Sequence, residues 1–149
     1  MRAYKICWAI LAILLVGGAT HADPMFFLLS EHTMASDIGK FSEPIGRTST
    51  FSTDDDQAVS WLLVWRDLEV HNVEWRWYYP EGRVYSRSFG VIPPVDGPAG
   101  LWAAPLWSCL KIKGYDPARM SGTWKVDVIV DYKKVLTEYF TIDGPIDCH

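Results

Sequence analysis

The chain has 149 residues, of which 49% are hydrophobic and 21% are charged, and its formal net charge is −4. This length is sufficient for one domain with a well-developed hydrophobic core. No run of like charges is long enough to indicate a nucleic-acid-binding tail. The acidic balance also argues against nucleic acid or an anionic membrane surface as a partner.

The first 22 residues have the composition of a secretory signal peptide. Two basic residues precede an apolar run over residues 6–16, and small residues end the segment at Ala22. This order is typical of a cleaved leader. The apolar run is shorter than the ~20 residues that a membrane-spanning helix requires, so membrane insertion after cleavage is not expected. We therefore expect export to the periplasm or the extracellular space, with residues 23–149 forming a single mature domain.

Two cysteines, Cys109 and Cys148, remain after removal of the leader, and the mature chain then carries twelve basic and eighteen acidic residues, a net charge of −6. In an exported protein an even pair of cysteines favours a disulfide. A bridge of that span would stabilise the fold by roughly 4 kcal/mol in the chain-entropy model. Two free thiols are the alternative.

The start of the mature chain has weak strand signals. Asp23–Leu29 is a short apolar run that predicts an edge strand or a lead-in, whereas residues 30–44 show no sustained period. Arg47–Thr53 alternates Ser and Thr with Phe51 and predicts a further edge strand. Asp54–Gln57 indicates a turn or a single helical turn. A calcium site is not expected there, because the three aspartates lack the spacing of a calcium-binding loop.

Two strong strand signals follow. Ala58–Leu68 is apolar on both faces, which predicts a central strand or one whose second face is covered. Val73–Tyr79 alternates apolar or aromatic residues with polar ones, and Pro80–Gly82 has the residues of a tight turn. Val84–Val91 returns as the partner strand. This part of the chain therefore predicts a β-hairpin.

The C-terminal part begins with a proline- and glycine-rich loop, Ile92–Gly100, and a strand from Leu106 onward. Tyr115–Gly122 predicts one turn of helix or a crossover, with Asp116 as its cap. In Gly122–Ile142, apolar residues alternate with polar ones on both sides of a turn at residues 131–134. This second hairpin has the clearest strand pattern in the chain.

Short strands separated by turns, without a long amphipathic helix, predict an all-β antiparallel sandwich of about seven strands. The segment Trp77-Tyr-Tyr-Pro-Glu-Gly82 and the later Gly122-Thr-Trp-Lys-Val-Asp-Val128 supply a W-x-x-P-x-G hairpin and a G-x-W-x-V-x-V hairpin. This pattern resembles small immunoglobulin-like β-sandwiches of bacterial exported and surface proteins, families that are largely uncharacterised. The resemblance covers residues 50–142 and concerns turns and core tryptophans. It implies a fold and supplies no catalytic residue.

Eight tryptophans, seven of them after the leader, are the most unusual feature of the composition. The parity of Trp75, Trp77 and Trp124 places them in the core, while Trp61 and Trp65 fit either face. Trp102 and Trp107 flank the proline-rich loop, and Tyr78 lies on the polar side of its strand. These last three residues are the candidates for an exposed aromatic binding surface.

The sequence contains no recognisable catalytic or cofactor motif. There is no G-x-S-x-G elbow, no Gly-rich phosphate loop, and no metal-ligand spacing among the histidines and cysteines. We therefore expect a non-catalytic module without cofactor or metal, binding a protein partner, with an edge strand such as Asp23–Leu29 as one means of pairing. Carbohydrate binding through Trp102, Trp107 and Tyr78 is the second hypothesis. A small enzyme that uses Cys109, with His71 as its base, is the third.

Overall fold

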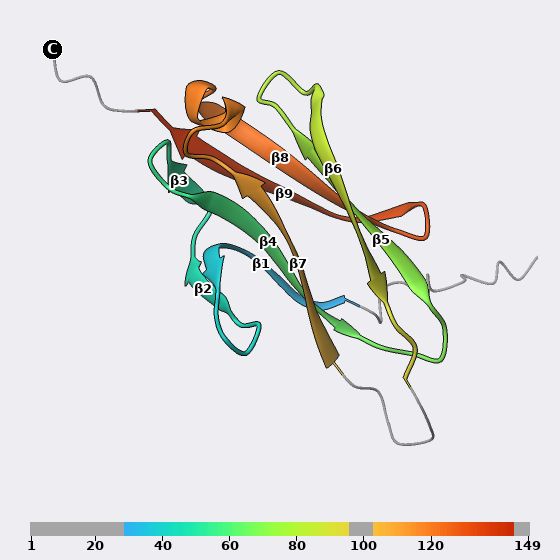
Figure 1. Cartoon of the computed structure of the whole chain (residues 1–149). Coiled ribbons are helices and arrows are strands. Elements are labelled where there is room, and N and C mark those ends of the chain that lie inside the picture. The colour runs from blue at the N-terminus through green and yellow to red at the C-terminus, as the bar shows by residue number, and fades with distance from the viewer. Residues whose placement is uncertain (1–28, 96–102, 145–149) are drawn as a thin grey trace, which may run out of the picture.

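The chain folds into two packed β-sheets (Figure 1). The computed structural model describes residues 29–95 and 103–144. The predicted leader therefore lies outside the described residues. Within those two ranges there are nine strands and one short 3₁₀ helix, η2 (Asp116–Arg119). The strands are β1 (Leu29–Ile38), β2 (Pro44–Arg47), β3 (Thr50–Ser52), β4 (Gln57–Trp65), β5 (His71–Tyr78), β6 (Val84–Ile92), β7 (Ala103–Lys111), β8 (Gly122–Val130) and β9 (Lys133–Asp143).

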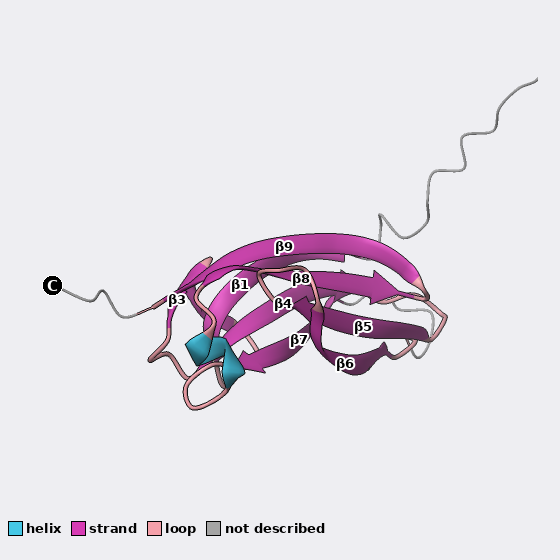
Figure 2. Cartoon of the chain, turned by 90° about the horizontal axis from the view of Figure 1, so that it is seen from above, coloured by secondary structure: helices cyan, strands magenta, loops and turns pink. Residues whose placement is uncertain are grey.

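One sheet has four strands in the order β2-β1-β4-β7, and the other has five in the order β3-β9-β8-β5-β6. The two sheets lie face to face as layers, with η2 at one end (Figure 2). Every pair is antiparallel except β3 and β9, which run parallel. The predicted all-β sandwich is thus confirmed. The predicted number of about seven strands is wrong, because nine strands occur in the described ranges.

The strands that the sequence did not predict are β1 and β2, which lie in residues 29–47. The inward positions of β1 are chemically mixed, so no apolar alternation is visible. His32 Nδ1 lies 2.9 Å from Glu138 Oε1, and the Ser60 hydroxyl donates to Glu138 Oε2 at 3.1 Å. Glu138 is only 9% exposed. A polar cluster of the exposed His32 with the buried Ser60 and Glu138 therefore takes the place of the apolar side chains that usually identify a strand.

Both predicted hairpins are confirmed. In β5–β6, Tyr79 and Arg83 close the turn, and Gly82 has a φ of 88°. In β8–β9, the pair Val130–Lys133 closes a two-residue turn at Asp131 and Tyr132, both with positive φ. Such a turn matches the twist of the flanking strands.

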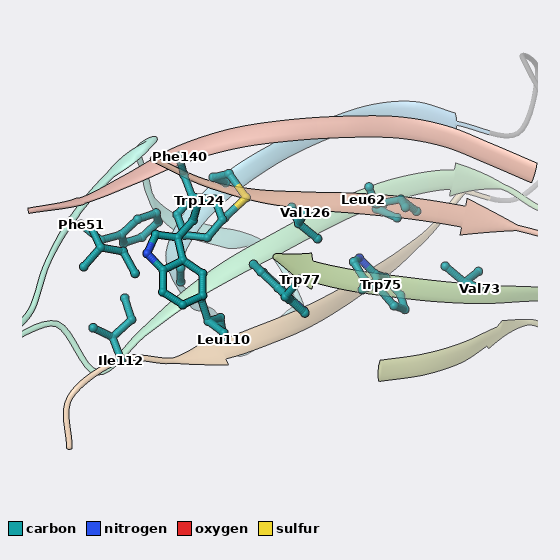
Figure 3. Packing of buried hydrophobic residues seen from close by; sticks show 14 of the residues in the cluster. Phe51, Leu62, Val73, Trp75, Trp77, Leu110, Ile112, Trp124, Val126 and Phe140 are labelled. Atoms are coloured by element: carbon teal, nitrogen blue, oxygen red, sulfur yellow. The ribbon is translucent and has the colours of Figure 1, made fainter. Parts of the chain in front are cut away.

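The sandwich interior is aromatic (Figure 3). Trp75, Trp77 and Trp124 are 2%, 1% and 0% exposed, so their predicted inward parity is confirmed. The ring of Phe140 contacts three other rings: its centroid lies 5.8 Å from those of Phe51 and Trp77 and 6.4 Å from that of Trp124. Edge-to-face and offset ring contacts of this kind stabilise a core beyond the burial of area.

Candidate functional site

The outer face of the four-stranded sheet carries an apolar surface, here called the tryptophan face. It is formed by the outward row of β4 and the outward row of β7. The opposite row of β4, which includes Leu62 and Val64, packs into the main core. Four cross-strand pairs make up the tryptophan face: Val59 with Cys109, Trp61 with Trp107, Leu63 with Pro105, and Trp65 with Ala103.

The three tryptophans of this face differ in exposure. Trp61 is 5% exposed, whereas Trp65 is 39% and Trp107 is 41% exposed. Trp61 is covered because its Nε1–H donates to the Ser42 carbonyl at 2.8 Å and the Arg47 guanidinium lies 5.8 Å from its ring. Trp61 is therefore a buried part of the tryptophan face, and the rings of Trp65 and Trp107 are exposed to solvent.

Polar pairs border the tryptophan face. Arg47 forms an ion pair with Glu31 along the β1–β2 side. At one end of the sheet, Lys111 donates to Gln57 at 2.8 Å, and Gln57 donates to Asp37 at 3.1 Å. An apolar centre with a polar border is the usual anatomy of a protein–protein interface.

The structure does not bring the three predicted binding residues together. Trp107 lies on the tryptophan face, whereas Tyr78 lies on the outer face of the other sheet, where Lys125 Nζ is 3.8 Å from its ring centroid. Trp102 lies outside the described residues. The sequence did not decide which side of the sheet Trp61 and Trp65 of β4 face, because alternation cannot distinguish the two faces of a strand when both are apolar.

Cys109 is exposed on the outward row of β7 and is not a buried core residue. The predicted disulfide with Cys148 stays a prediction, since Cys148 lies outside the described residues. Partial burial raises the pKa of the Cys109 thiol, and the smaller opposing effect of Lys111 does not reverse this. A raised pKa disfavours the thiolate that a cysteine nucleophile requires.

His71, the proposed base for Cys109, is held elsewhere. Its Nδ1 lies 2.6 Å from Asp131 Oδ2, and its Nε2 lies 3.0 Å from Asp67. Burial alone would lower the pKa of His71, but the hydrogen bonds with Asp131 and Asp67 outweigh burial and raise it above 6.5. The pKa of Asp131 is lowered, first by its hydrogen bond to His71 and then by the Asn72 backbone N–H. This cluster ties the β4–β5 connection to the β8–β9 turn, and both ring nitrogens of His71 are engaged.

The described residues contain no group of three or more His, Cys, Asp or Glu side chains placed to hold a metal ion. Among residues 29–95 and 103–144, no helix has the length and hydropathy to cross a membrane. The Asp54–Asp56 segment is a turn in which Asp55 accepts a hydrogen bond from the Ser52 backbone N–H at 2.7 Å.

Comparison with known proteins concerns the fold. No family model matches the chain, and no curated protein matches it. An immunoglobulin-like protein from Pseudomonas aeruginosa is similar over 78% of this chain and 94% of that protein, with 10% identity and a TM-score of 0.48. The CARDB domain of a Pyrococcus furiosus protein, solved with di-metal ions, is similar over 78% of this chain and 90% of that domain, with 11% identity and a TM-score of 0.42. The two packed β-sheets of the structure agree with the predicted resemblance to immunoglobulin-like β-sandwiches.

Proposed function

We propose that the chain is an exported, non-catalytic module that binds a protein partner through the tryptophan face. One observation carries the proposal: four adjoining outward pairs contain no charged residue, and two of their tryptophans are about 40% exposed. The outer face of a sandwich sheet is normally polar, since it faces water. A contiguous exposed apolar surface on a soluble domain marks an interaction site.

A protein partner fits this face better than a small ligand does. The face is a row of side chains on a sheet, bordered by the Glu31–Arg47 ion pair and the Gln57 cluster. The residues that contribute most of the binding energy of an interface are enriched in tryptophan and lie near its centre, inside a border of weaker contacts. We expect Trp107 and Trp65 to be buried by the partner and the polar border to stay partly hydrated.

Strand addition at the start of the mature chain is a separate mechanism. Of Asp23–Leu29, only Leu29 lies in the described residues, as the first residue of β1. β1 pairs with β4 from Leu29 onward, but its register with β2 begins at Ala35. The first half of β1 therefore has one side without a neighbouring strand in the described sheet, which is compatible with pairing to a partner. This mechanism stays a prediction.

A charge-introducing variant tests the tryptophan face. Tagged wild-type protein, Trp107→Glu and Tyr139→Glu would be cross-linked in an extract of the native compartment, and bound proteins quantified by mass spectrometry. Tyr139 is 64% exposed on the other sheet and is therefore a matched control. Loss of a central tryptophan costs about 2 kcal/mol or more, which is about thirtyfold in affinity. We expect one partner to be recovered with wild type and Tyr139→Glu and lost with Trp107→Glu. Equal recovery with all three would refute the proposal.

Export is tested independently of binding. Sequencing the N-terminus of protein recovered from the periplasm or the medium should begin at Asp23, directly after the predicted cleavage site at Ala22. Recovery of the intact chain in the cytoplasm alone would contradict this part of the proposal.

A further inference from the structure

The outer face of the five-stranded sheet contains a trough that is separate from the tryptophan face. Tyr78, one of the aromatic candidates from the sequence, lines part of it. Two depressions of about 360 Å³ and 400 Å³ adjoin there, because both are lined by Glu74, Ile129 and Tyr132. Phe89 and Val91 of β6 line the first, and Arg76 and Lys134 line the second. Each volume is within the ~300–1,000 Å³ range of small-molecule sites. The feature is called the polar trough below.

The side chains of the polar trough combine exposed rings with fixed polar groups. Phe89 is 74% exposed and Tyr132 is 99% exposed, on β6 and on the β8–β9 turn. Glu74, which lines both depressions, accepts two hydrogen bonds from Arg76, at 2.9 Å and 3.1 Å, and lies 3.6 Å from Arg87. These contacts with Arg76 outweigh partial burial and lower the pKa of Glu74, so it is ionised at neutral pH.

The second carboxylate of the polar trough, Asp127, is also held in place. It accepts a hydrogen bond from the Thr137 hydroxyl at 2.7 Å and lies 3.5 Å from Lys125 Nζ and 3.8 Å from Lys134 Nζ. Glu74 and Asp127 therefore each already have two cationic neighbours. Asp131, which lines the first depression, is paired with His71. A ligand does not have to supply a charge here, but it must hydrogen-bond with the carboxylate and guanidinium groups that it covers, since burying them without partners is costly.

Tyr132 is not explained by the stability of the fold. It has a φ of 68° at the second position of a two-residue turn, where Gly or Asn is favoured because a side chain there is strained. At 99% exposure its ring buries almost nothing within the chain. A strained residue that contributes no packing points to a role in binding.

We propose that the polar trough binds a neutral saccharide chain, with Tyr132 and Phe89 stacking on pyranose rings. A pyranose has apolar C–H faces for the exposed rings, and its hydroxyl groups both donate and accept hydrogen bonds, as Glu74 and Arg76 require. An apolar ligand would displace the water that satisfies the remaining hydrogen-bonding capacity of Glu74 and Arg76, and a charged ligand would face carboxylates that are already paired with cations. This site is on the sheet opposite the tryptophan face, and it is independent of the proposed protein interaction.

The test uses purified mature protein and four defined probes. Cellohexaose, maltohexaose and xylohexaose are neutral, and a galacturonate hexamer is the charged counterpart; binding is followed by calorimetry and by NMR shifts. We expect at least one neutral hexamer to bind more tightly than the galacturonate hexamer, with the largest shifts at Tyr132 and Phe89. No binding by any neutral hexamer, or tighter binding of the charged one, would overturn the proposal.

Variants separate binding from folding. An aromatic ring contact is worth about two- to twelvefold in affinity, so Tyr132→Gly and Phe89→Ala together should lower affinity by about four- to 140-fold. Tyr139→Ala, on the same sheet but outside both depressions, should change affinity less than twofold. Tyr132→Gly relieves the positive φ, so its urea midpoint should not fall. Retained affinity in the double variant would refute stacking, and a Tyr132→Gly midpoint well below wild type would show that Tyr132 has a structural role instead.

Discussion

Phe140→Ala is the substitution that tests the aromatic core most directly. Phe140 is 2% exposed on β9, and its ring contacts those of Phe51, Trp77 and Trp124. Its chain neighbour Tyr139 points to the opposite face and is 64% exposed. Because successive side chains of a strand face opposite sides, the two positions differ only in which side of the sheet they occupy.

The expected magnitude follows from the contacts that are lost. Truncating a buried Phe to Ala costs about 3–5 kcal/mol, including the cavity that remains. Three ring pairs at about 0.5–1.5 kcal/mol each account for a substantial part of that loss. Since small domains are stable by only about 5–15 kcal/mol, Phe140→Ala should leave a marginally folded protein. Tyr139→Ala should stay within about 0.5 kcal/mol of wild type, as other exposed substitutions do.

Urea unfolding followed by tryptophan fluorescence measures both variants, because Trp77 and Trp124 report on the environment of Phe140. The slope of the free energy against urea should be unchanged, and only the midpoint should move. If Tyr139→Ala destabilises as much as Phe140→Ala, the inward row of β9 is assigned wrongly. The register of β8 with β9, Trp124 opposite Phe140, would then be refuted as well.

Two further predictions concern pH and glycine. The raised pKa of His71 means that its contribution to stability is complete below pH 6.5 and is lost as pH rises through the higher folded pKa. Between pH 6 and 9 the unfolding free energy of wild type should therefore fall more than that of His71→Gln, and parallel curves in urea titrations would contradict this. Gly122 has a φ of 138°, and an added Cβ would lie 3.3 Å from Pro80, so Gly122→Ala should cost about 1–3 kcal/mol. Gly114→Ala, with a φ of 81° and nothing within 4 Å, should cost less in the same assay; an equal cost would show that contact with Pro80 contributes nothing.

The sequence predicted the two long hairpins because β5 and β8 alternate large apolar inward residues with mainly charged or polar outward ones, and a turn sequence follows each strand. It failed for β1, since His32 faces inward toward a buried carboxylate, Glu138, from a strand about a hundred residues away. That partnership depends on tertiary contacts, and local alternation has no means of showing it. The predicted cap at Asp116 also failed: Tyr115 occupies the N-cap position of η2 and makes no side-chain capping hydrogen bond.

The candidate sites were less predictable than the fold for a related reason. Trp107 was recognised as an exposed aromatic residue, but the tryptophan face requires the pairing of β4 with β7, which sets Trp61 opposite Trp107. The polar trough requires β5, β6 and β8 to be neighbours and the β8–β9 turn to project Tyr132 beside them. The sequence did single out Tyr78, which lines the second depression. Tyr132, at a turn position that favours glycine, becomes a visible signal only when the two-residue length of the turn is known.

The opposite placement of the two surfaces makes their roles separable by experiment. Trp107 belongs to the outward row of the four-stranded sheet and Tyr132 to the outward side of the five-stranded sheet, with the aromatic core between them. Trp107→Glu should therefore abolish capture of a protein partner without changing the affinity for a neutral hexasaccharide. Tyr132→Gly should instead lower the affinity for the hexasaccharide without changing capture of the protein partner. A variant that impairs both activities while keeping its wild-type urea midpoint would mean that one ligand contacts both sheets, and the separation of the two sites would be wrong.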